Sequence, residues 1–171
     1  MSKKLIVIRH AKSSWDTPGI SDFDRPLNGR GRKNAPEMGR RLKQSGIQPD
    51  LMLSSPARRA ISTAQAIAAV LGYPAQDIAT DFDLYLAGAH TILRVLRGQN
   101  DAHKCIMLFS HNEGITDFAN MLSGHYLDNL PTAGVIGFTF RCASWSEIAP
   151  HKGKFCFYDY PRNEVVGVYK L

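Results

Sequence analysis

The sequence predicts an α/β fold of three layers, α/β/α, in which a mostly parallel central sheet carries helices on both faces and residues 1–171 form one domain. Short aliphatic runs of strand length alternate with longer segments that are apolar along one stripe, the pattern of such a sheet. The length of 171 residues falls within the roughly 100–200 residues of a common domain. With 44% apolar and 21% charged residues, the chain has the composition of a packed globular protein.

The strands are expected at runs rich in β-branched and other apolar residues, which suit strands buried on both faces. Each run is too short to form an independent helix, and polar or turn-forming residues bound it. The expected strands cover residues 4–8, 51–53, 105–109, 135–141 and 154–160, with more weakly marked ones at 77–83 and 165–169.

The helices are expected between these runs, over residues 29–45, from about 56 to 71, 90–96 and about 114–122. Asn28 is a candidate N-cap and Gly46 a candidate C-cap of the first helix. Ser55 is a candidate N-cap of the second, with Pro56 as its first helical residue. Residues 11–27 are rich in turn-forming residues and predict a long loop, and long loops inside compact domains are often functional.

Cysteine usage and hydropathy exclude several protein classes. The longest aliphatic run near the start, residues 5–8, is far shorter than the ~18 apolar residues of a membrane span, and it does not resemble a signal peptide. Cys105, Cys142 and Cys156 are odd in number and widely spaced, which argues against a disulfide framework and against a zinc site. We therefore expect a cytoplasmic protein with three buried or half-buried thiols and no membrane partner.

The charge balance raises the question of nucleic-acid binding. The formal net charge is +6, and positive residues concentrate between Arg25 and Arg41 and at the pair Arg58-Arg59. Basic patches bind phosphate backbones through counterion release. No run of five or six basic residues occurs, so the sequence predicts no basic tail and nucleic acid is not the expected partner.

Residues suited to phosphate chemistry follow three of the expected strands. Arg9 and His10 come directly after the first strand, and Ser110 and His111 come directly after the strand at 105–109. The strand at 51–53 leads into an Arg-Arg pair. If these strands are parallel neighbours, their carboxyl ends gather two imidazoles and several guanidinium groups, which together select an anion such as phosphate.

Four segments carry a resemblance to a known family. In order along the chain they are Ile8-Arg9-His10, Arg25-Pro26-Leu27-Asn28-Gly29-Arg30-Gly31, Ser54-Ser55-Pro56-Ala57-Arg58-Arg59-Ala60-Ile61-Ser62-Thr63-Ala64 and Phe109-Ser110-His111-Asn112. The set resembles the histidine phosphatase (phosphoglycerate mutase-like) superfamily. The short chain and the Arg-Pro-Leu segment further resemble its SixA-type phosphohistidine phosphatases.

The resemblance implies a role for each matched position. The family pattern Ser-Pro-x-x-Arg-Ala-x-x-Thr has its phosphate-binding arginine directly before Ala60, which selects Arg59 rather than Arg58. The other implied roles are His10 as the histidine that becomes phosphorylated, Arg9 as its phosphate-binding neighbour, His111 as the second catalytic histidine, Arg25 as a further phosphate-proximal arginine, and Asn112 as a substrate-binding neighbour without a fixed role.

One departure from the family concerns the proton donor. Many members place a glutamate general acid after the third strand, where this chain reads Asp-Leu-Tyr-Leu-Ala-Gly from Asp83. The acid is therefore absent or replaced by Asp83. An alkoxide leaving group benefits from a positioned acid, whereas a leaving imidazole has a reference pKa of ~6.5 and takes its proton from solvent. This contrast favours a phosphoramidate substrate such as protein phosphohistidine.

The expected activity is that of a phosphatase without metal or cofactor, which works through a phosphohistidine intermediate on His10. Its partner would be a phosphohistidine-bearing protein, and an open site without a large lid would admit such a side chain. The alternative is a small-molecule phosphomonoester phosphatase of the same superfamily; a mutase is disfavoured because it needs an enclosed site. A non-catalytic phosphate- or nucleic-acid-binding module is the least favoured hypothesis.

Overall fold

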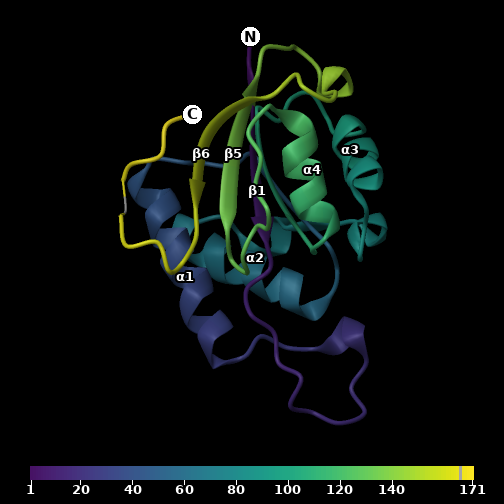
Figure 1. The fold of residues 1–171 in the computed structure, drawn as a ribbon, viewed down its shortest axis with the longest axis vertical. Helices are drawn as coiled ribbons and strands as arrows, with labels where there is room; N and C mark the ends of the chain where they lie inside the picture. The colour runs from purple at the N-terminus through teal and green to yellow at the C-terminus, as the bar shows by residue number, and fades with distance from the viewer. Residues whose placement is uncertain (166) are drawn as a thin grey trace.

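The computed structural model describes residues 1–165 and 167–171, and it contains one mixed sheet with helices on both faces (Figure 1). The strands follow the spatial order β3-β2-β4-β1-β5-β6. They are β1 (Lys3–Arg9), β2 (Leu51–Ser54), β3 (Ala79–Thr80), β4 (Cys105–Ser110), β5 (Val135–Phe140) and β6 (Lys154–Asp159). The α-helices are α1 (Gly29–Gln44), α2 (Arg58–Leu71), α3 (Ala89–Arg97) and α4 (Gly114–Leu122).

The sheet confirms the expected α/β class and adds an antiparallel edge. Strands β1, β4, β2 and β3 pair in parallel, whereas β5 runs antiparallel to β1 and β6 runs antiparallel to β5. Residues 141–153 between β5 and β6 hold only a short 3-10 helix, Trp145–Glu147. A parallel pairing usually needs a crossover through an α-helix, and this link has none, so β6 returns beside β5 as an antiparallel neighbour.

Alternating residues of β1 divide the core between the two faces of the sheet. Leu5 and Val7 pack with residues of α3 and α4, whereas Ile6 and Ile8 pack with residues of α1 and α2. Side chains of successive strand residues point to opposite faces, so a strand buried on both sides needs a continuous apolar run. The run in β1 therefore holds the two helical layers to one sheet.

The ends of β1 and β4 form a switch point in the topology. These two strands are parallel neighbours, but β1 continues to α1 on one face and β4 continues to α4 on the other (Figure 1). The chain therefore diverges at the carboxyl ends of the two strands and leaves a crevice between the connections. Ligand sites of open α/β sheets lie in such crevices.

Two glycines allow the helices beside this crevice to begin close to neighbouring backbone. A Cβ at Gly31 in α1 would lie 2.2 Å from the carbonyl oxygen of Lys12, and one at Gly114 in α4 would lie 1.7 Å from that of Ala87. Any side chain at either position would collide with backbone. The loop after β1 and the segment before α3 are therefore held directly against the helix N-termini.

The helix ends differ in part from the expectations. Asn28 is the N-cap of α1, as predicted, and its side chain accepts a hydrogen bond from the Gly31 amide at 2.9 Å. At the other end Ser45 is the C-cap, and Gly46 follows it with a left-handed φ of 73°. The expected start of α2 was wrong, because Ala57 is its N-cap and the Ser55 hydroxyl contacts a histidine from the end of β4.

Two expected strands also need correction. The segment 77–83 forms a strand only at β3, between 3-10 helices at Ala75–Asp77 and Phe82–Leu84. The expected strand at 165–169 is absent from residues 165 and 167–169, and residue 166 lies outside the described residues. Instead of pairing with a strand, the Tyr169 amide donates to the Ser45 hydroxyl at 2.8 Å.

The sequence also predicts the burial of the cysteines and the absence of a membrane-spanning segment. All three cysteines are free, with Cys105 buried and Cys142 and Cys156 half-buried, as predicted. Across residues 1–165 and 167–171, none of the helices combines the length and the apolar character that a membrane crossing requires.

Candidate active site

The strand register brings His10 and His111 together. Arg9 at the end of β1 lies opposite Ser110 at the end of β4, and each histidine is the next residue along its strand. The ring centroids are 5.2 Å apart, and the side chains are nearly buried, with His10 7% and His111 2% exposed. The structure therefore places the two histidines together at the carboxyl ends of neighbouring strands, as the sequence predicts.

The orientation of His10 fixes which ring nitrogen is available. Its Nδ1 lies 2.8 Å from the backbone oxygen of Ala11, and because a carbonyl can only accept, Nδ1 carries the proton. The lone pair of the neutral ring is then on Nε2. The Ala11 amide donates to the Thr63 hydroxyl at 2.9 Å, and that hydroxyl donates to the Arg59 carbonyl at 2.7 Å, which fastens the His10 segment to α2.

His111 is held by Ser55, three residues before the start of α2. Its Nε2 lies 2.7 Å from the Ser55 hydroxyl, which also accepts the Ala57 amide at 3.2 Å. Its Nδ1 is buried and has no hydrogen-bond partner within the described residues. A hydroxyl that accepts from Ala57 can donate its own hydrogen to Nε2, and Nδ1 then carries the ring proton and is a hydrogen-bond donor.

Burial and positive neighbours keep both imidazoles neutral. Burial, together with repulsion from the charges of Arg59 and Arg9 and from His111 if it were protonated, lowers the pKa of His10 to about 3 against the opposing hydrogen bond to Ala11. Burial, followed by the charge of Arg59, lowers the pKa of His111 to about 3. A neutral imidazole at ordinary pH is the form that can act as a nucleophile.

Three arginines surround the histidine pair. Arg59 is 2% exposed and Arg25 6% exposed, and Arg9 is half-buried, whereas Arg58 points to solvent. Arg9 donates to the Leu130 carbonyl at 3.0 Å. The Nε atoms of Arg9 and Arg59 are buried without a hydrogen-bond partner in residues 1–165 and 167–171. Buried donors of this kind are costly to leave unpaired, so the cluster is suited to an anion.

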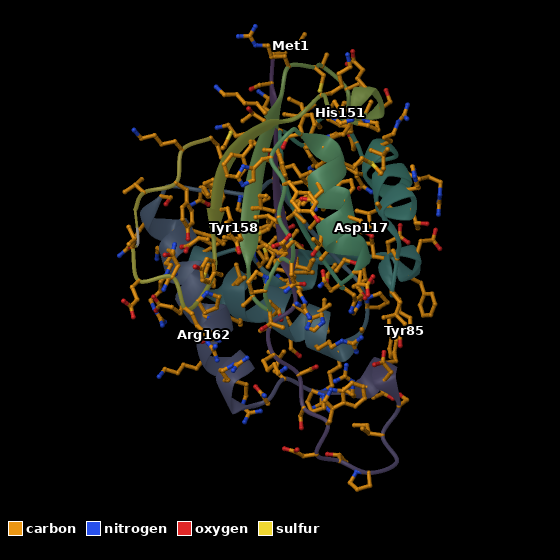
Figure 2. All side chains as sticks on the ribbon, in the orientation of Figure 1. Met1, Tyr85, Asp117, His151, Tyr158 and Arg162 are labelled. Atoms are coloured by element: carbon orange, nitrogen blue, oxygen red, sulfur yellow. The ribbon has the colours of Figure 1, made fainter. Side chains whose placement is uncertain are left out.

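A carboxylate that sequence reasoning missed, Asp22, joins two of these arginines. It lies in the 3-10 helix Asp22–Asp24 and contacts Arg25 Nε at 3.2 Å and Arg59 at 3.1 Å. The Tyr85 hydroxyl donates to it at 2.5 Å, and Figure 2 shows Tyr85 just above the short purple helix. Although partial burial opposes ionisation, the hydrogen bonds from Tyr85 and Arg59 and the charge of Arg59 lower the pKa of Asp22 to about 2.

The signal for Asp22 was present in the sequence but was not used. Asp22 lies three residues before Arg25, inside the loop between β1 and α1, whereas the family pattern predicts an acid in the segment after β3. The candidate from that segment, Asp83, does not line the histidine pocket. Its side chain is 56% exposed and lies 3.4 Å from Arg94 of α3.

The histidine pair opens into a pocket of about 280 Å³ that collects the expected site residues. Its lining consists of Arg9, His10, Lys12, Ser13, Trp15, Asp22, Arg25, Arg59, Leu86, His111, Asn112 and Thr132. The Asn112 side chain donates a hydrogen bond to Asn129 and accepts one from Thr116. A larger hollow of about 670 Å³ around Lys4 and Arg141 contains none of the motif residues, so the chemistry favours the smaller pocket.

Metal ligands do not gather in the described part of the chain. Residues 1–165 and 167–171 contain no group of three or more His, Cys, Asp or Glu side chains placed to hold an ion.

Comparison with known proteins places this geometry in a family. Residues 5–84 match the model of the histidine phosphatase superfamily (branch 1). An uncharacterised chloroplastic protein of Arabidopsis thaliana is 31% identical over 137 residues; the match covers 72% of this chain and 61% of that protein, about three fifths of its length. The crystal structure of a candidate phosphohistidine phosphatase SixA from Agrobacterium tumefaciens has a TM-score of 0.78 and 26% identity, with 93% of this chain and 98% of that one covered.

The chain belongs to the histidine phosphatase superfamily. A further structure, the protein histidine phosphatase SixA complexed with tungstate, has a TM-score of 0.79 at 20% identity and covers 92% of this chain and 97% of that one. This likeness shows a common fold across almost the whole chain, including the segments beyond residue 84 that contribute His111 and Asn112.

The neutral histidines predict that this superfamily member loses stability in acid. A histidine with a folded pKa of about 3 and an unfolded value near 6.5 stabilises the fold fully above about pH 6.5 and loses that contribution as the pH falls toward 3. Each such group lowers the free energy of unfolding by about 2 kcal/mol between pH 8 and pH 5. Urea unfolding of the wild type and of His10→Asn at pH 8 and pH 5 measures this change. The free energy of unfolding should fall less in the variant than in the wild type. Equal falls in the two proteins would contradict neutral burial of His10.

The second prediction concerns the charge of Asp22. Asp22→Asn keeps an acceptor for Tyr85 and Arg59 but removes the negative charge, so we expect inorganic phosphate to bind several-fold more tightly. Asp24→Asn in the same 3-10 helix, an exposed carboxylate bonded to Ser21, is the matched control and should leave phosphate binding unchanged. Calorimetric titration at low and high salt measures phosphate binding by both variants. Weaker phosphate binding in Asp22→Asn would contradict this prediction and would mean that Asp22 mainly holds the arginines in place.

Proposed function

We propose that this protein is a phosphatase that works through a phosphohistidine intermediate on His10, and that its preferred substrate is phosphohistidine in proteins. The observation that carries the proposal is the state of His10: neutral, with Nδ1 bound to the Ala11 carbonyl and the lone pair of Nε2 available in the pocket. The guanidinium groups of Arg9 and Arg59 and the ring of His111 line the same pocket and provide donors for the oxygens of a phosphoryl group.

In the first step, His10 Nε2 attacks phosphorus in line with the leaving group. The bond between phosphorus and the leaving nitrogen breaks, and that nitrogen takes the electron pair and a proton from solvent. Arg9, Arg59 and His111 hold the phosphoryl oxygens while charge redistributes. Electrostatic positioning of this kind supplies most of the catalysis in phosphoryl transfer.

In the second step, water attacks the phosphorus of phosphorylated His10. The bond between Nε2 and phosphorus breaks, inorganic phosphate leaves, and the neutral ring is restored with the release of one proton. The guanidinium groups supply positive charge in both steps, so we expect turnover without an added metal ion.

The carboxylates around the pocket support the choice of leaving group. Asp22 has a pKa of about 2 and is ionised at neutral pH, so it cannot supply a proton to an alkoxide. Asp83 is exposed and paired with Arg94 outside the pocket lining. An imidazole, whose reference pKa is ~6.5, leaves without a positioned acid. The SixA relatives, one of which holds tungstate, are consistent with a phosphate-like anion and a phosphohistidine substrate.

The experiment compares steady-state hydrolysis of a phosphohistidine peptide, p-nitrophenyl phosphate and a sugar phosphate, with and without EDTA. We expect the phosphohistidine peptide to be hydrolysed at least about 100-fold faster than the sugar phosphate, with no effect of EDTA, because an imidazole leaves without a positioned acid and a sugar alkoxide does not. His10→Ala should abolish turnover, whereas Arg58→Ala, a solvent-facing neighbour of Arg59, should retain it.

Other outcomes of the same comparison would contradict the proposal. Preference for the sugar phosphate would support the small-molecule alternative and require an acid that the carboxylates described above do not provide. Unchanged turnover in His10→Ala would exclude a phosphohistidine intermediate at that residue, and binding of phosphate without any turnover would support the non-catalytic alternative.

A further inference from the structure

Trp15 is an exposed aromatic residue at the edge of the active-site pocket. Its side chain is 74% exposed, and it lines the pocket together with His10 and Arg59. Aromatic side chains stabilise a protein mainly by burying their apolar surface. An indole that is this exposed beside a phosphate pocket contributes little to the core, and its surface is available to a ligand.

The backbone beside Trp15 is fixed, although the side chain is exposed. Ser13 forms an isolated antiparallel bridge with Leu27, and the Ser14 amide donates to the Pro26 carbonyl at 2.8 Å. These contacts tie together the two ends of the loop between β1 and α1, the purple loop at the foot of Figure 1. Trp15 is the next residue, so its ring is presented from an anchored position.

One face of the indole is already occupied. The guanidinium carbon of Arg25 lies 3.5 Å from the Trp15 ring centroid, a cation–π contact. Arg25 is itself held by the Ser13 hydroxyl at 2.8 Å and by Asp22 at 3.2 Å. The indole is therefore oriented by a buried arginine, and its exposure leaves the remaining ring surface open beside the phosphate site.

We propose that Trp15 is a specificity-determining residue whose exposed indole stacks on the planar ring attached to the phosphoryl group of the substrate. The inference rests on the proposed function, because the ring it assigns is the leaving imidazole of phosphohistidine. Stacking on an indole favours flat aromatic rings, and the side chain of a phosphorylated serine offers no such face. Trp15 would thus recognise the leaving group, while the arginines recognise the phosphoryl group.

The experiment compares two substrates that share a phosphorus–nitrogen bond, a phosphohistidine peptide and phosphoramidate, of which only the first carries a ring. In Trp15→Ala we expect kcat/KM for phosphohistidine to fall about tenfold more than kcat/KM for phosphoramidate, the size expected for loss of one stacked pair. Trp15→Phe retains an aromatic face and should restore most of the difference. Tyr126→Ala removes a similarly exposed aromatic residue outside the pocket and should leave kcat/KM for both substrates unchanged.

The outcomes separate this inference from the proposed function. Equal losses on both substrates in Trp15→Ala would mean that Trp15 acts only through Arg25, and they would overturn the stacking role while leaving the phosphatase intact. Failure of Trp15→Phe to restore phosphohistidine turnover would also overturn it. A wild-type protein that hydrolyses phosphoramidate but not phosphohistidine would overturn the proposed substrate and, with it, the ring assigned to Trp15.

Discussion

The site depends on the parallel pairing of β1 with β4, which places two imidazoles side by side at the end of the sheet. Because Arg9 and Ser110 are opposite one another, His10 and His111 leave the sheet at the same level, and the diverging connections to α1 and α4 open a crevice there. The same pairing buries both rings among arginines. Burial and the positive neighbours then make the neutral imidazole the stable form.

A cluster of buried guanidinium groups would be unfavourable without a compensating anion. Asp22 supplies that charge from the loop after β1, with Tyr85 as a further donor to the same carboxylate oxygen. Asp22 forms ion pairs with Arg25 and Arg59. The Nε atoms of Arg9 and Arg59 are still buried without a hydrogen-bond partner among the described residues. The arrangement is thus partly neutralised, and this balance suits the proposed function, in which the site binds a phosphoryl group and releases phosphate.

The sequence predicted those features that depend on local residue patterns. The buried strands and the residues at the ends of β1 and β4 followed from apolar runs and from the motif order, and Asn28 was found by its capping chemistry. Asp22 was missed because its spacing from Arg25 indicates only a local ion pair, whereas its contact with Arg59 depends on a loop that folds back over α2. Ser55 was assigned to a helix end because its partner, His111, is 56 residues away in the chain.

The central claim is that His10 is the residue that becomes phosphorylated. The most direct measurement mixes the wild-type protein with a phosphohistidine peptide, stops the reaction in alkali within the first turnover, and locates the phosphate by fragment mass spectrometry. The account predicts a phosphate on His10 that is stable in alkali and lost in acid, and that does not form in His10→Ala. Phosphate on another residue, or turnover through direct attack of water with no phosphorylated enzyme, would contradict it.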